Sequence, residues 1–154
     1  MNLLALDLAT KTGFAAEIER RRESGWKDFT PLPGEGPGWR YIRFNVWLYS
    51  WKEKSLELVV VEKTIPNMTH AMTSEIAFGL STRVTEFCAR QRVKLIGVHN
   101  ATLKKYFCGD GRAEKYEMVR MAQEIDPGVK DDNEADALLL LMYTKLVILK
   151  GKKR

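Results

Sequence analysis

Residues 56–62 have the sequence LELVVVE, the most strand-like stretch in the chain. Its consecutive apolar and β-branched residues are typical of a strand buried on both faces at the centre of a parallel sheet. Such a sheet needs helices on both of its sides, so this stretch predicts an α/β fold. Glu62 ends the stretch, and a carboxylate at the end of a buried strand is costly unless something neutralises it.

The rest of the chain divides into short apolar runs and longer stretches with helical spacing. The expected strands are residues 2–8, 12–18, 26–32 and 94–98, and the expected helices are residues 39–54, 69–92, 113–125 and 133–149. An antiparallel opening meander followed by βαβ units predicts a five-stranded mixed sheet flanked by helices on both faces. The arginines of residues 19–23 are expected in the exposed connection between the second and third strands, because burying them would be costly.

Bulk properties limit the classes of protein to consider. The chain has 154 residues, so we expect one domain over residues 1–150 with a single core, and a basic tail over residues 151–154. A net charge of +5 suits a polyanionic partner such as DNA. No signal peptide or membrane span is expected, because Asp7 and Lys11 interrupt the first apolar stretch. The chain is therefore expected in the cytoplasm, which also suits two free cysteines.

Two further acids occupy positions like that of Glu62. Asp7 ends the apolar run of residues 2–6, and Asp136 precedes the apolar run of residues 137–142. Each acid alone has a structural explanation, as a turn residue, an ion-pair partner or a helix cap. Together at one sheet edge they would repel one another, and a hard divalent cation such as Mg²⁺ or Mn²⁺ would remove that repulsion. The three acids therefore predict a metal-dependent site.

Five segments, in order along the chain, resemble the RuvC family of Holliday junction resolvases. They are residues 3–15 (opening strand and hairpin), 59–62 (second acidic motif), 78–83 (glycine and arginine of the next helix), 104–115 (basic glycine loop) and 133–138 (C-terminal acidic motif). The resemblance implies an RNase H-like fold, a homodimer and cleavage of four-way DNA junctions. It also implies four acidic ligands for two Mg²⁺ or Mn²⁺ ions. The compact length is closer to a phage-encoded member.

The resemblance assigns three ligands directly and leaves the fourth open. Asp7, Glu62 and Asp136 match the motifs, but Asn133 stands where the family usually has an acid. We expect Asp132 to replace that acid, because positions four apart share one face of a helix. Glu134 is the weaker candidate, because it points off that face.

Two ions can cleave a phosphodiester by activating a water and stabilising the leaving oxygen. Asp7 would then bridge the ions, Glu62 would hold one of them, and Asp132 and Asp136 would hold the other. Lys115 would approach the scissile phosphate and stabilise its developing charge, unless it is simply a solvated helix lysine.

Basic and apolar residues near these acids suggest contacts with DNA. Lys104, Lys105, Arg112 and Lys115 flank two glycines that let the backbone approach a phosphate. Ile65 and Met68 follow Glu62 and are candidates for an apolar contact at the junction core, or for packing in a dimer.

The expected helix of residues 69–92 is the candidate dimer interface. Its apolar residues exceed what one buried stripe needs; they are Met72, Ile76, Phe78, Leu80 and Val84. Trp39, Ile42, Val46 and Tyr49 form a stripe on the expected helix of residues 39–54. The helical spacing of Trp39, Trp47 and Trp51 favours packing in a core or interface over base stacking.

Three other functions compete with junction resolution. A general RNase H-like nuclease for branched DNA or RNA would use the same acids. An ATP-binding protein of the actin-like fold would need a far longer chain than 154 residues. A catalytically inactive DNA-binding member of the fold would have no use for Asp7, Glu62 and Asp136 together.

Overall fold

The computed structural model describes residues 1–66 and 68–151. Its centre is a five-stranded sheet in the order β3-β2-β1-β4-β5. The strands are β1 (Leu3–Asp7), β2 (Lys11–Ile18), β3 (Arg21–Asp28), β4 (Leu58–Glu62) and β5 (Lys94–Val98). The first three pair antiparallel, whereas β1, β4 and β5 are parallel. The predicted mixed sheet is therefore confirmed, with the stretch that includes residues 58–62 next to β1.

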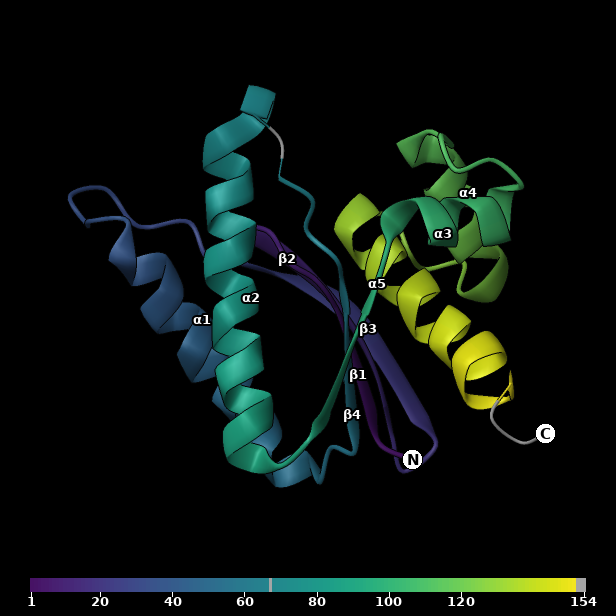
Figure 1. Cartoon of the computed structure of the whole chain (residues 1–154), viewed down its shortest axis with the longest axis horizontal. Coiled ribbons are helices and arrows are strands. Elements are labelled where there is room, and N and C mark those ends of the chain that lie inside the picture. The colour runs from purple at the N-terminus through teal and green to yellow at the C-terminus, as the bar shows by residue number, and fades with distance from the viewer. Residues whose placement is uncertain (67, 152–154) are drawn as a thin grey trace.

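Helices cover both faces of this sheet (Figure 1). They are α1 (Gly38–Ser50), α2 (Ala71–Gln91), α3 (Asn100–Cys108), α4 (Lys115–Ile125) and α5 (Asp132–Tyr143), and short helical turns are η1 (Trp51–Lys54), η2 (Met68–His70) and the π-helical η3 (Thr144–Leu149). One face carries α1 and α2, and the other carries α3, α4 and α5 (Figure 1). The prediction of helices on both faces is also confirmed.

The strand alternation divides the core into two layers. Leu4 and Leu6 of β1 pack with α1 and α2, whereas Leu3 and Ala5 pack with α5. All four side chains are at most 1% exposed, so the apolar run of β1 is buried on both faces. Burial fixes the positions of the carboxyl ends of β1 and β4, which are Asp7 and Glu62.

The third strand lies earlier in the chain than predicted. Residues 26–32 were the expected strand and residues 19–23 the connection, but β3 begins at Arg21. Glu19 and Arg20 form a two-residue hairpin turn, and both have positive φ (51° and 69°). The arginines need no burial, because β3 is an edge strand and Arg21 and Arg22 stay exposed.

The apolar stripe of α1 faces away from the sheet. Trp39, Ile42, Val46 and Tyr49 are between 37% and 71% exposed, while Phe44 is fully buried against the sheet. Helical spacing thus predicted the helix but not which of its two apolar faces packs inward. The three tryptophans also differ: Trp51 is buried, Trp47 is half-buried among aromatic rings, and Trp39 is exposed.

The predicted dimer surface on α2 is partly wrong. Leu80 and Val84 are fully buried in the layer between α2 and the sheet. Only Met72 and Phe78 remain largely exposed, at 75% and 41%, and Ile76 is half-buried. The long helix uses its apolar residues mainly to complete the core of its own chain.

Candidate active site

The acids at two strand ends lie side by side. β1 and β4 are parallel neighbours in the register Leu6↔Val61, so Asp7 and Glu62 follow at the same edge of the sheet. Ligand sites of open α/β sheets form at this edge, beyond the carboxyl ends of the strands. Asp132 and Asp136 approach from α5, one helical turn apart.

A glycine lets α5 reach this edge. Gly13 of β2 pairs with Asp7, and a Cβ built on Gly13 would lie 1.8 Å from the backbone oxygen of Asn133. Any side chain at position 13 would therefore push the first turn of α5 off the sheet. The missing side chain is what brings Asp132 and Asp136 close to Asp7.

Burial and mutual repulsion perturb the carboxyls. Burial raises the pKa of Asp7 well above its ordinary value, and the negative charges of Glu62, Asp136 and Asp132 raise it further. Burial, with the charges of Glu62 and Asp132, raises the pKa of Asp136 to about 7. Burial also raises the pKa of Glu62. Strongly perturbed acids gathered at one sheet edge are typical of a functional site.

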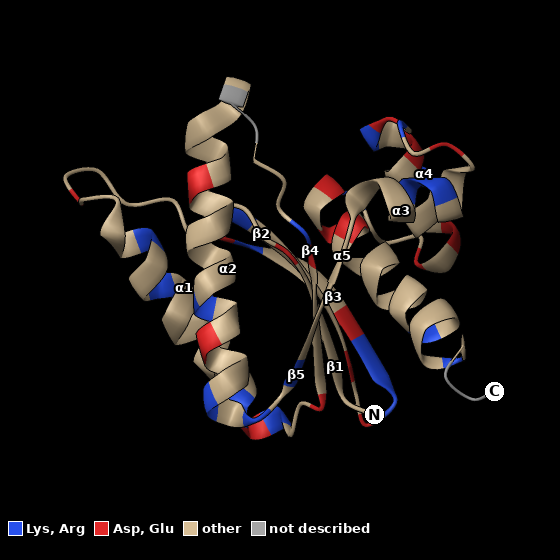
Figure 2. Ribbon diagram, in the orientation of Figure 1, with Lys and Arg blue, Asp and Glu red and all other residues tan. Residues whose placement is uncertain are grey.

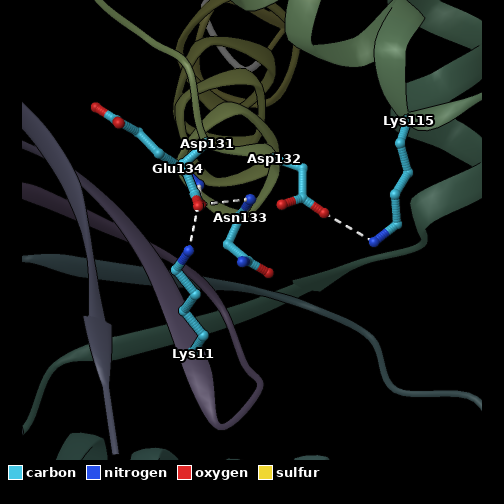
Figure 3. A network of polar contacts seen from close by, with 6 residues as sticks. All are labelled: Lys11, Lys115, Asp131, Asp132, Asn133 and Glu134. Carbon is cyan, nitrogen blue, oxygen red and sulfur yellow. Dashed lines mark hydrogen bonds and ion pairs between the residues drawn. The ribbon is translucent and has the colours of Figure 1, made fainter.

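Neutral and cationic side chains engage two of these acids. Lys115 Nζ donates to Asp132 Oδ2 at 2.7 Å (Figure 3). Asn100 Nδ2 donates to Glu62 Oε2 at 2.8 Å. The positive charge of Lys104 acts to lower the pKa of both Glu62 and Asp136, so this lysine also lies near the acids. The sequence had no local signal for Asn100, which lies 38 residues from Glu62.

The environment of the first turn of α5 favours Asp132 over Glu134 as the fourth acid. The charge of Asp132 acts on Asp7 and Asp136, which means that it faces the same site. Glu134 instead accepts a hydrogen bond at 2.7 Å from Ser24 Oγ of β3. Asn133 lines a separate hollow beside Thr10 and Lys11. The choice of Asp132 stays a prediction.

The donor set fits a hard divalent cation. Four carboxylates supply only oxygen, and a cation would offset the burial and the repulsion that raise the pKa of Asp7 and Asp136. As they lie, however, no group of three or more acidic, histidine or cysteine side chains within residues 1–66 and 68–151 is close enough to hold a metal ion.

A cavity of about 350 Å³ opens beside Asp7 and Glu62. Lys63, Ile65 and Thr73 help to line it, so Ile65 shares this cavity with the acids, and its role at the junction core stays a prediction. Ile65 is 64% exposed and free to contact a ligand. The other junction-core candidate is Met68, whose side chain lies outside the part of the chain that the structure describes.

The predicted basic loop is partly a helix. Lys104 and Lys105 lie in α3, a helix that was not among the expected ones. They point in different directions, because Lys105 lines a hollow with Tyr106 and Tyr143 rather than the acidic site. Arg112 is exposed in the turn between α3 and α4. Figure 2 shows basic residues on α3 and on this turn, beside the acids at the start of α5.

Comparison with solved structures extends the likeness to the whole chain. Thermus thermophilus RuvC superposes with a TM-score of 0.74 at 20% identity, covering 98% of this chain and 97% of that one. This chain has the RuvC fold. T. thermophilus RuvC in complex with a Holliday junction substrate has a TM-score of 0.76 at 19% identity, covering 98% and 96%. The expected RNase H-like fold is thereby confirmed.

More distant structures match as well, whereas sequence comparisons do not. The yeast mitochondrial Holliday junction resolvase has a TM-score of 0.59 to this chain at 11% identity, over 90% of this chain and 75% of that one. No family model and no curated protein matches by sequence. In the described part of the chain, the helices are too short or too polar to cross a membrane.

Proposed function

We propose that the chain is a structure-selective endonuclease that cleaves four-way and related branched DNA in the cytoplasm. The observation that carries this proposal is the convergence of four acids with Lys104 and Lys115 at one edge of a RuvC-type sheet. Solved structures of that fold include a complex of RuvC with a Holliday junction substrate. Residues 1–150 would form the nuclease domain.

Asp7, Glu62, Asp132 and Asp136 would hold Mg²⁺ or Mn²⁺, two ions in each site. When bound, the ions supply an activated water and charge stabilisation for hydrolysis of a phosphodiester. The four acids would bind the ions and fix their positions. Burial raises the pKa of Asp7 and Asp136, and a bound cation would replace the solvation that their carboxylates lose. Asn100 orients Glu62 through its amide hydrogen bond.

Lys115 would act on the substrate phosphate. Its side chain is 80% exposed, so it can leave Asp132 and reach a phosphate at little cost. Lys104, Lys105 and Arg112 would contact the DNA backbone, where contacts position the duplex without reading its sequence. Ile65 would contact the junction core from the cavity beside Glu62.

Two copies would act together, because a four-way junction has approximate two-fold symmetry and its resolution needs two matched incisions. The exposed apolar stripe of α1, defined by Trp39, Ile42, Val46 and Tyr49, offers a surface for the second copy. Phe78 of α2 is a further exposed apolar side chain on the same layer. A contiguous apolar surface of this kind commonly marks a protein interface.

The decisive experiment compares cleavage of a four-way junction with cleavage of linear duplex and RNA–DNA hybrid in Mg²⁺ or Mn²⁺. The parent protein should cut the junction at least tenfold faster, and Asp7→Asn, Glu62→Gln and Asp136→Asn should each abolish cutting but still bind the junction. Lys130→Gln, at an exposed residue before α5, is the matched control and should cut normally. Equal cutting of all substrates would favour a general nuclease, and junction binding without any cutting would favour an inactive member of the fold.

A further inference from the structure

The N-cap of α5 and its first residues hold a concentration of negative charge. Asp131, Asp132, Glu134 and Asp136 fall within six residues. The positive end of a helix dipole favours acids at this terminus, but four of them also repel one another. Two of the four are ligands in the function proposed above, on which this inference rests. Their orientation therefore depends on what holds the turn in place.

Lys11, the first residue of β2, contacts this turn from the sheet. Its Nζ donates to Asp131 Oδ2 at 2.5 Å (Figure 3). The same atom lies 3.9 Å from the ring centroid of Trp26 on β3. The Asp131 side chain is only 15% exposed, so this ion pair is better shielded from solvent than an ordinary surface pair. The contact joins residues 120 positions apart in the chain.

Asp131 divides its two oxygens between the helix and the lysine. Its Oδ1 accepts hydrogen bonds from the backbone N–H groups of Asn133 at 2.9 Å and Glu134 at 3.2 Å. Its Oδ2 accepts the bond from Lys11. The same carboxylate thus caps the helix and ties the capped turn to β2, next to the strand that ends at Asp7.

We propose that Lys11 is a positioning residue for the acidic site, because its ion pair with the helix cap Asp131 fixes the direction in which Asp132 and Asp136 project. Lys115 contacts the same turn from the opposite side, through Asp132 (Figure 3). The two lysines differ in exposure, since Lys11 is 40% exposed and Lys115 is 80% exposed. Lys11 would therefore keep its ion pair with Asp131 when Lys115 leaves Asp132 to contact a substrate phosphate.

The test uses two substitutions that break the ion pair from either side. Lys11→Gln removes the cation, and Asp131→Asn removes the anion but keeps an oxygen that caps the helix nearly as well. Each should weaken Mn²⁺ binding, measured by calorimetry, on the order of tenfold. This is the low end of the loss in affinity expected when a residue that holds a metal ligand in place is replaced. Each should also speed hydrogen exchange at the amides of Asn133 and Glu134 in the metal-free protein. The double variant should be no worse than either single variant.

Lys145→Gln is the matched control. Lys145 of η3 pairs with Glu17 of β2, so it ties the far end of the same helical segment to the same strand. The exposures of that pair, 32% and 19%, resemble those of Lys11 and Asp131. Its loss should lower the melting temperature by a similar amount and leave Mn²⁺ binding and exchange at Asn133 and Glu134 unchanged.

Three results would overturn the proposal. Unchanged amide exchange at Asn133 and Glu134 in both variants would show that the pair does not hold the turn. Additive losses in the double variant would show that the two residues act separately. Weaker junction binding by Lys11→Gln alone, with Asp131→Asn unaffected, would make Lys11 a DNA contact. If the parent binds no Mn²⁺, the proposed function fails, but the exchange measurement still decides the role of Lys11.

Discussion

The surroundings of Asp136 disfavour its charged form. Burial and the neighbouring Glu62 and Asp132 raise the pKa of its carboxyl from 3.8 to about 7. Between these two values the folded protein binds a proton that the unfolded chain has released. The contribution of Asp136 to the stability of the metal-free protein is therefore present at low pH and is lost as the pH rises through the folded pKa.

This shift leads to a prediction about the metal-free protein. Its melting temperature in chelator should fall between about pH 5 and about pH 8, and it should fall less in Asp136→Asn, which has no charge to bury. At about pH 8 the variant should be the more stable of the two. Scanning calorimetry of both proteins across that range measures the difference. Parallel pH profiles would mean that Asp136 titrates as an ordinary surface acid.

At the scale of elements, the contact between β2 and α5 decides whether the acids meet. Gly13 is the point of closest approach, because a Cβ there would lie 1.8 Å from the backbone of Asn133. Backbone atoms cannot rotate aside as a flexible side chain can. The first turn of α5 would have to move, and with it Asp132.

Gly13→Ala should therefore destabilise the fold by about 1–3 kcal/mol or more and reduce metal binding at the same time. The control is Gly36→Ala, since no atom of residues 1–66 and 68–151 outside Gly36 and its two chain neighbours lies within 4 Å of the Cβ that it would add. Urea unfolding gives the free energy of both variants. A Gly13→Ala protein as stable as Gly36→Ala would contradict the close packing of α5 on β2.

At the scale of the whole molecule, the apolar stripe of α1 is solvent-exposed in the single chain. Val46 is 71% exposed and Ile42 is 49% exposed, although both are large apolar residues. Burying them in a second copy would give the two active sites a fixed spacing, which two matched cuts require.

Val46→Glu should shift the protein from dimer to monomer at micromolar concentration, raising the dissociation constant about tenfold or more. Sedimentation velocity measures the shift. Leu146→Glu is the control, because Leu146 is also exposed, at 38%, but lies in η3 on the opposite face of the sheet. A parent that stays monomeric with and without junction DNA would leave the single-cut nuclease as the better proposal.

The sequence by itself determined the sheet and the candidate acids of the strands. The short apolar runs that end at Asp7 and Glu62 are typical of strands buried on both faces, where pairing within a sheet satisfies the backbone groups that burial removes from water. A charged residue at the end of such a run can be recognised as a candidate site residue from the sequence alone, before its partners in space are known. The apolar run after Asp136 marked the last helix in the same way.

Only the tertiary structure decided which residues support those acids. Asn100 lies 38 residues from Glu62, and Lys11 lies 120 residues from Asp131, so no local period connects them. The inward face of α1 and the turning of Glu134 toward Ser24 were also undetermined. Local sequence determines which segments must be buried, but the choice among polar partners depends on side chains that only packing brings together.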